Sequence, residues 1–161
     1  MPIATGDSIP TDVKLKEMTD AGPTDVTSGE LFAGKKIVLF AVPGAFTPTC
    51  SMKHLPGFVE QAAAIKAKGA DDVICLSVND AFVMGAWGKD QGAGGKVRMI
   101  ADGNGEFTSA LGLTMDGSGF GMGQRSQRYA LVANDGKVEH LLVESGPGLD
   151  VSSAESVLGK L

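Results

Sequence analysis

Residues 37–51 read IVLFAVPGAFTPTCS, and the fold is decided in this stretch. Its first five residues, 37–41, form a short continuous apolar run rich in β-branched side chains, which is typical of a strand buried on both faces of a parallel sheet. The Pro-Gly and Thr-Pro pairs that follow break regular structure, and a helical pattern begins near Ser51. Cys50 is therefore expected in or beside the first turn of a helix that follows a buried strand.

The position of Cys50 favours a reactive sulfur. The first N–H groups of a helix have no partner within the helix and carry a partial positive charge, which stabilises a thiolate. Thr47 lies three residues before the sulfur, where a dithiol reductase of the Cys-x-x-Cys type has its first cysteine. Cys50 is thus a candidate nucleophile with a hydroxyl beside it. A free cysteine is otherwise most often a small buried apolar side chain without chemistry, and these residues alone leave that alternative open.

Outside this stretch the apolar pattern predicts alternating strands and helices. Strands are expected at residues 13–18, 25–27, 73–78, 97–101, 129–133 and 138–143. Helices are expected at residues 28–32, 51–68, 79–87 and 105–111, and at the C-terminal end. Pro56 is expected to kink the long helix, Asn79 resembles an N-cap, and Ser152 with Glu155 forms a capping box for the last helix. This order of elements predicts a mixed central sheet flanked by helices, with an N-terminal hairpin.

Length and composition narrow the class of protein. The chain has 161 residues and a net charge of −5, which argues against nucleic acid as a partner because such a partner requires a basic face. No apolar run approaches the ~20 residues that span a bilayer, and the first residues lack the regions of a secretory signal. Two cysteines make no disulfide framework, which favours a reducing compartment. We expect one domain over residues 1–161, in a soluble intracellular protein of the cytoplasm, or of the chloroplast in mature form, that is not secreted.

The motif VPGAFTPTCS at residues 42–51 resembles the active-site motif of peroxiredoxins, in which Pro, three residues, Thr, two residues and Cys follow one another. The runs HLPGF at residues 54–58 and LSVNDAFV at residues 76–83 resemble the type II, plant-type branch, which also contains the mammalian atypical two-cysteine peroxiredoxin. The resemblance covers essentially the whole chain. It implies a thioredoxin fold with additions. It also implies a thiol-dependent peroxidase that reduces hydrogen peroxide and organic hydroperoxides through a sulfenic acid at Cys50.

The resemblance also implies which residues surround the sulfur. A thiolate attacks one oxygen of the O–O bond, and fixed donors lower the barrier because negative charge grows on the leaving oxygen. The implied donors are the Thr47 hydroxyl, backbone N–H groups at the helix start, and Arg128. This arginine stands immediately before the strand at residues 129–132, as in peroxiredoxins, although an arginine at a strand start is usually just a solvated end. Pro43 would shield the sulfur from water.

Five further residues are candidates for the substrate pocket, namely Gly44, Phe46, His54, Leu113 and Phe120. His54 follows Cys50 by one helical turn on the same face, where it could polarise the pocket or simply pack and hydrogen-bond. The leucine and the two phenylalanines could build an apolar rim that favours organic hydroperoxides, but core packing explains each of them equally well. Arg125 is expected to support the site or to lie on the surface.

Residues 112–124 are expected to form a glycine-rich loop that exposes Leu113, Met115, Phe120 and Met122. Large apolar side chains on such a loop usually indicate a partner surface. Type II peroxiredoxins pair through loops beside the active site, so the resemblance implies a homodimer with Phe120 at or near the interface. The alternative is that these side chains fold back over the chain's own core.

Cys75 is a possible secondary thiol in the middle of a predicted buried strand. It is either an inert core thiol or a partner that could reach Cys50 only if the active-site helix unwound. The mammalian relative carries a resolving cysteine in its C-terminal tail, whereas this chain has Val151 near that place. The resemblance therefore implies that an external thiol, from glutathione and glutaredoxin or from thioredoxin, recycles the sulfenic acid.

The two alternative functions are a thioredoxin-fold thiol transferase and a redox-regulated binding module. Thr47 in place of a second cysteine disfavours the transferase, and the set of Thr47, Cys50 and Arg128 disfavours a module that would not need a charge beside its sulfur. The glycine-rich run at residues 92–96 lacks the spacing of a phosphate loop. With two histidines and two cysteines far apart, the sequence predicts no metal site and no cofactor.

Overall fold

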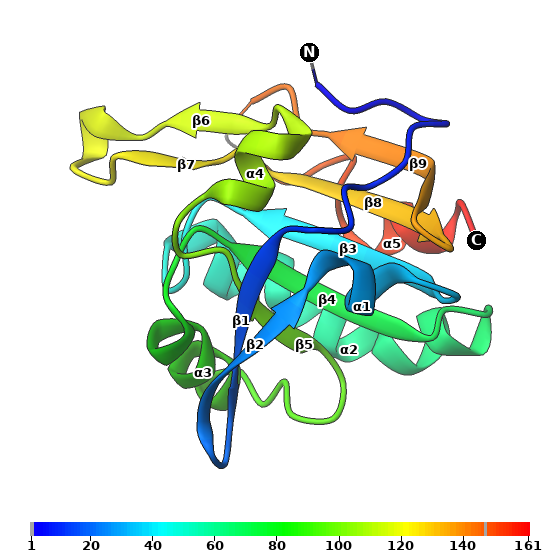
Figure 1. The fold of residues 1–161 in the computed structure, drawn as a ribbon, viewed down its shortest axis with the longest axis horizontal. Coiled ribbons are helices and arrows are strands. Elements are labelled where there is room, and N and C mark those ends of the chain that lie inside the picture. Colours follow the sequence, from blue (N-terminus) through cyan, green and yellow to red (C-terminus); the bar gives the residue numbers. More distant parts are fainter. Residues whose placement is uncertain (1, 147) are drawn as a thin grey trace.

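The structure is a computed structural model that describes residues 2–146 and 148–161. A seven-stranded sheet in the order β2-β1-β5-β4-β3-β8-β9 forms its centre (Figure 1). The strands of this sheet are β1 (Lys14–Thr19), β2 (Gly22–Thr27), β3 (Lys36–Val42), β4 (Asp72–Ser77), β5 (Arg98–Ala101), β8 (Tyr129–Asn134) and β9 (Lys137–Val143). Strands β3, β4 and β5 run parallel, and the remaining pairs are antiparallel, so the predicted mixed sheet is confirmed.

Strand β3 lies inside the sheet, between β4 and β8, and its residues from 37 to 42 are all buried. Because side chains alternate along a strand, Val38, Phe40 and Val42 enter one apolar core and the residues between them enter the other. A strand covered on both faces needs apolar side chains at every position, which explains the continuous run in the sequence.

Within the described residues, five α-helices cover the two faces of the sheet. Helices α2 (Leu55–Ala67), α3 (Ala81–Asp90) and α5 (Ala154–Leu158) pack on one face, and α1 (Ser28–Phe32) and α4 (Glu106–Leu111) pack on the other (Figure 1). The ring of Phe40 stacks on that of Phe58 at a centroid distance of 4.0 Å, which fixes α2 against β3. Fully burying each such ring contributes about 1.5–3 kcal/mol.

The helix that carries Cys50 begins slightly earlier than predicted and contains a wider turn. Pro48 is already helical, and the Ser51 N–H donates to the Thr47 carbonyl at 2.9 Å. Residues Cys50–His54 then form a π-helical turn, η1, which the Leu55 N–H closes on the Cys50 carbonyl. The irregularity expected at Pro56 takes this form, since proline has no N–H to give to the preceding turn.

The two predicted helix caps are each wrong by one residue. Asp80, rather than Asn79, caps α3 by accepting a hydrogen bond from the Val83 N–H at 2.8 Å, and the helix runs on to Asp90. Asn79 instead accepts from the Ala45 N–H at 3.0 Å. The last helix is likewise capped by the residue after the predicted one, Ser153, whose hydroxyl accepts from the Ser156 N–H. In both cases two neighbouring residues are suitable caps. The first of them makes a tertiary hydrogen bond instead, and the second caps the helix.

The glycine-rich segment at residues 112–124 is more regular than a loop. Strands β6 (Thr114–Asp116) and β7 (Gln124–Ser126) form an antiparallel ribbon around a short 3₁₀ turn, η2 (Ser118–Phe120), and the ribbon projects from the body in Figure 1. The expectation that Leu113 is exposed is wrong, because this side chain is buried in the same core as α4. Phe120, at 85% exposed, lies open on the ribbon as predicted.

Candidate active site

Cys50 lies just beyond the carboxyl end of β3, and its side chain is fully buried. The Nη2 of Arg128 donates a hydrogen bond to the Cys50 Sγ at 3.2 Å. Arg128 reaches the sulfur because it directly precedes β8, whose first residue, Tyr129, pairs with Ala41 near the end of β3. The sulfur therefore has a buried guanidinium, with its positive charge and N–H donors, as a direct neighbour.

The Thr47 hydroxyl is oriented by the loop that precedes the helix. It donates to the Gly44 carbonyl at 2.7 Å, so its single proton is used and its oxygen is left as an acceptor. The Thr47 oxygen can therefore accept a hydrogen bond from a ligand, and the role of this hydroxyl toward the peroxide stays a prediction. A Cβ at Gly44 would lie 3.2 Å from the Thr47 methyl group, so a larger side chain there would push against the threonine.

His54 is fully buried and connects Arg128 to the C-terminal part of the chain. Its Nδ1 lies 2.9 Å from the Arg128 Nη1, and its Nε2 lies 2.9 Å from the Ser152 carbonyl oxygen. A guanidinium can only donate and a carbonyl can only accept, so the imidazole is neutral and carries its proton on Nε2. Burial, with the Arg128 charge adding to it, lowers the pKa of His54 to about 3, which agrees with the neutral form.

Arg128 uses only part of its donor capacity. Its Nη1 and Nη2 are bound to His54 and Cys50, but its buried Nε has no hydrogen-bond partner among the described residues. A buried guanidinium N–H without a partner costs free energy unless a ligand or water satisfies it. This edge of Arg128 is thus available to an oxygen ligand.

The proposed apolar rim is only partly assembled. Phe46 is 52% exposed, has a backbone φ of 63°, and lies with its ring 6.3 Å from that of Trp87. Leu113 does not belong to the site, because it packs in the core on the opposite face of the sheet from Cys50. Arg125 is half-buried, and its Nη1 donates to the Pro43 carbonyl at 3.4 Å, which supports the active-site loop.

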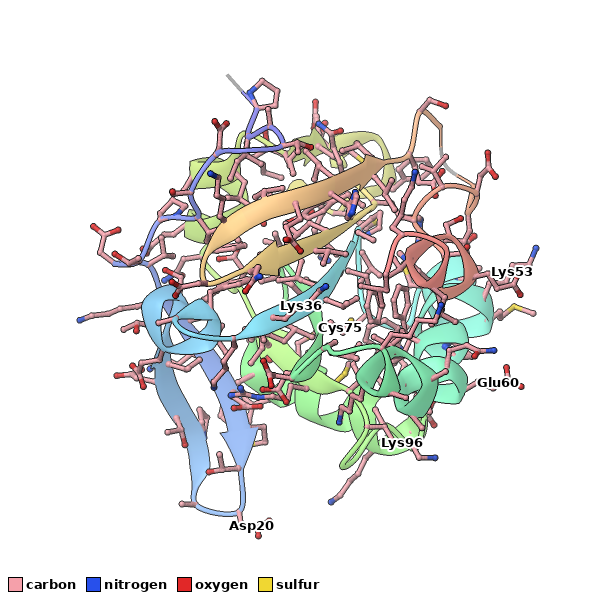
Figure 2. All side chains as sticks on the ribbon, turned by 90° about the vertical axis from the view of Figure 1, so that its right-hand side faces the viewer. Asp20, Lys36, Lys53, Glu60, Cys75 and Lys96 are labelled. Carbon is pink, nitrogen blue, oxygen red and sulfur yellow. The ribbon has the colours of Figure 1, made fainter. Side chains whose placement is uncertain are left out.

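Cys75 lies in the interior of the molecule on β4, paired with Phe40 of β3 (Figure 2). It shares an apolar core with Cys50, and both cysteines are free. Burial raises the pKa of the Cys75 thiol well above its usual value, and the nearby Cys50 adds to the shift. Cys75 is thus held as a neutral thiol, which is a poor nucleophile.

Two residues of this network were not found from the sequence. The Ser152 carbonyl binds His54, and the Glu144 carboxylate accepts from the Ser152 N–H at 2.8 Å and from the Ser152 hydroxyl at 2.6 Å. No local pattern indicates these contacts, since 98 positions separate His54 from Ser152. Only the tertiary arrangement brings them together.

The described ranges, 2–146 and 148–161, contain no group of three or more His, Cys, Asp or Glu side chains that could hold a metal ion. Over the same ranges, no helix is long and apolar enough to cross a membrane.

Known proteins match this chain both in sequence and in fold. The chain matches the Redoxin family over residues 4–158. It is 50% identical to Peroxiredoxin-2B of Arabidopsis thaliana over 161 residues, which covers 99% of each chain. It is 53% identical over 164 residues to the chloroplastic Peroxiredoxin-2E-2 of Oryza sativa subsp. japonica, covering 99% of this chain and 72% of that one. Reduced Prx3 of Vibrio vulnificus in complex with hydrogen peroxide superposes with a TM-score of 0.93 at 52% identity, covering 98% of both chains.

The mixed sheet, the buried cysteine at a helix start and the family match together define a redoxin with the thioredoxin-like peroxiredoxin fold. Within that class the chain belongs to the type II, plant-type peroxiredoxins, which are thiol-dependent peroxidases. The resemblance drawn from residues 42–51 and the predicted fold are thereby confirmed.

Proposed function

We propose that Cys50 is the thiol that attacks the hydroperoxide and that Arg128 holds both the thiolate and the substrate. The contact of 3.2 Å between the Arg128 Nη2 and the Cys50 Sγ carries this proposal. The guanidinium is permanently charged, so it places a positive charge and N–H donors beside the sulfur. The open Nε–H of Arg128 is a suitable donor to a peroxide oxygen that would bind beside the sulfur.

The reaction follows from these positions. The Cys50 thiolate attacks the hydroxyl oxygen of R–O–O–H, an S–O bond forms, and the O–O bond breaks to give a sulfenic acid and RO⁻. The attacked oxygen keeps its proton and donates it in a hydrogen bond to the Thr47 oxygen, whose own proton is bound to Gly44. Arg128 and the N–H groups at the helix start stabilise RO⁻ until it takes a proton from water.

Two residues are proposed to shape access to the sulfur. Pro43 is half-buried at the end of β3 and is proposed to shield the thiolate from bulk water. Phe46, in the loop between β3 and the helix of Cys50, is proposed to form an apolar wall that favours organic hydroperoxides, because its ring is half-exposed beside that of Trp87. Gly44 admits the close approach of Thr47 and Arg125 on which the loop depends.

An external thiol is proposed to recycle the enzyme, with glutathione and glutaredoxin or thioredoxin as the source. One thiol displaces water from the sulfenic acid to form a mixed disulfide, and a second thiol releases Cys50 as a thiol and leaves as the disulfide. The buried, neutral Cys75 supports this proposal because it is poorly suited to the first step. Steady-state turnover with each reductant system in turn separates the two sources.

We also propose a homodimer and an intracellular location. Phe120, 85% exposed at the end of the β6–β7 ribbon, supports a partner surface on that side of the molecule. The protein is proposed to act in the cytoplasm or the chloroplast, and residues 1–161 are proposed to form one peroxiredoxin domain. A relative named as chloroplastic supports the second location.

Stopped-flow measurement of thiol loss in the reduced protein after mixing with hydrogen peroxide tests the proposed function. The rate constant per molar peroxide is expected to exceed that of free cysteine by several orders of magnitude, since the site supplies a stabilised thiolate and fixed donors. A rate no faster than that of free cysteine would overturn the assignment of Cys50 and Arg128.

A further inference from the structure

Behind Arg128 a buried series of polar contacts runs away from the sulfur. It passes from Cys50 to Arg128 at 3.2 Å, from Arg128 to His54 at 2.9 Å, and from His54 to the Ser152 carbonyl at 2.9 Å. Glu144 ends the series by accepting the Ser152 N–H and hydroxyl. Peroxide chemistry at the sulfur uses the first two members only, so the function of the remaining three needs an explanation.

His54 is held rigidly in the orientation that Arg128 requires. Its ring lies 4.9 Å from that of Phe40 and 5.6 Å from that of Phe58, which confines the imidazole between the sheet and helix α2. The Ser152 carbonyl fixes the proton on Nε2 and leaves the lone pair of Nδ1 directed at Arg128. The surrounding residues thus determine the position of the His54 ring, its tautomer and the direction of its Nδ1 lone pair.

Glu144 joins both ends of this arrangement. Its backbone N–H donates to the Arg128 carbonyl at 3.0 Å, and its carboxylate accepts from the Asp150 N–H at 2.8 Å as well as from Ser152. The turn at residues 150–152 is therefore tied to the same residue that holds the Arg128 backbone. Hydrogen bonds to a carboxylate are among the stronger ones, so this turn is a firm support for the Ser152 carbonyl.

We propose that His54 is a positioning residue of the peroxidase, which holds the Arg128 guanidinium on the Cys50 sulfur and is itself held by the turn at residues 150–152. This inference rests on the proposed function of Cys50 and Arg128. With His54 in place, the guanidinium is bound at Nη1 and Nη2 and presents its Nε edge in one orientation. Without His54, the contact to Cys50 alone would let the guanidinium rotate, and the Nη1 would be a second buried donor without a partner.

The test compares reaction with hydrogen peroxide and alkylation by iodoacetamide at the same pH, using His54→Leu, His54→Gln and the wild type. Leucine removes both hydrogen bonds, whereas glutamine keeps an acceptor for Arg128 and a donor for Ser152. The peroxide rate of His54→Leu is expected to fall between about tenfold and about a hundredfold, because small displacements of a positioning group cost that much. His54→Gln is expected to recover most of the rate. His140→Leu, on β9 and outside this series, is the matched control.

Alkylation distinguishes positioning from a merely structural role. Cys50 is fully buried, so a site that opens would react faster with iodoacetamide. We expect alkylation of His54→Leu to stay at or below the wild-type rate while its peroxide rate falls. An unchanged peroxide rate, or alkylation that rises as the peroxide rate falls, would overturn the inference.

A variant that fails to fold does not end the test. If His54→Leu is insoluble, His54→Asn takes its place, because the shorter amide reaches Arg128 or Ser152 but not both. The same fall without faster alkylation supports the inference, and a wild-type peroxide rate overturns it. A wild-type protein that reacts no faster than free cysteine would instead count against the proposed function itself, so the two failures are told apart.

Discussion

The Nη2 of Arg128 lies 3.2 Å from the Sγ of Cys50, although the two residues are 78 positions apart in the chain. The sheet explains this contact, since Ala41 of β3 pairs with Tyr129 of β8 and places Arg128 opposite the end of β3. The chain turns from that end into the helix of Cys50. The contact therefore depends on strand register, and a shift of one residue would point Arg128 to the other face of the sheet.

Arg128→Lys is expected to slow the reaction with hydrogen peroxide by more than about tenfold. Lysine keeps the charge, but it cannot contact Cys50, His54 and a peroxide oxygen through one planar group. Stopped-flow kinetics of the reduced protein measure the effect, with Arg125→Lys expected to cost less because Arg125 contacts a backbone carbonyl of the loop. An unaltered rate in Arg128→Lys would transfer the charged role to Arg125.

The two cysteines are expected to behave differently when replaced by serine. Cys50→Ser should abolish peroxidase turnover, whereas Cys75→Ser should keep most of it. Cys75 lies on β4 as a buried thiol, and burial raises its pKa, so it stays neutral. Thiol loss after a single addition of peroxide measures the first step, and circular dichroism confirms that both variants fold. Equal loss of the first step in two folded variants would show that our assignment of roles is wrong.

The predictions from the sequence succeeded where short-range rules decide the outcome. The runs at β3 and β4 are apolar throughout because both faces of these strands are covered, and such runs are legible without a partner strand. Caps were missed by one residue at Asp80 and Ser153, because each has a neighbour that could cap equally well. Cys50 and Arg128 could be paired only through the resemblance to a family, since nothing in the residues between them indicates the register.

The support behind the site could not be predicted for the same physical reason. His54 was recognised as facing the same side as Cys50, but its partner Ser152 and the carboxylate of Glu144 come from a turn that no local pattern places near the helix. The prediction for Leu113 was wrong because the local sequence, a leucine after a glycine, is the same for an exposed loop and for a segment that packs under α4.

Stability is expected to fall in mild acid because His54 must stay neutral in the folded protein. Its pKa is lowered from 6.5 to about 3, first by burial and then by Arg128. Below about pH 6.5, His54 binds a proton in the unfolded chain but stays neutral in the folded chain. Acid therefore favours unfolding. Above about pH 6.5 both states are neutral and the effect is absent.

The free energy of unfolding measured by urea denaturation tests this expectation. Between about pH 6.5 and about pH 4.5, His54 should reduce wild-type stability by at most about 1.4 kcal/mol per pH unit. His54→Gln should lose this part of the slope, while His140→Gln should keep it. Parallel slopes for wild type and His54→Gln would contradict a neutral, buried His54.

Phe120→Ala is expected to weaken a two-fold dimer. The side chain is 85% exposed at the turn of the β6–β7 ribbon, and such an exposed ring on a projecting element contributes little to the monomer's own core. Sedimentation should find the wild type dimeric at tens of micromolar, roughly the range in which even weak association is visible, and Phe120→Ala shifted toward the monomer. Met52→Ala, which alters another highly exposed apolar side chain, on the helix of Cys50, is the matched control.

A wild type that stays monomeric at that concentration would rule out the dimer. A dimer that Phe120→Ala leaves intact would place the interface away from the ribbon. If Phe120→Ala instead lowers both association and the rate with peroxide, assembly supports the loop of Phe46 and Thr47 beside Cys50.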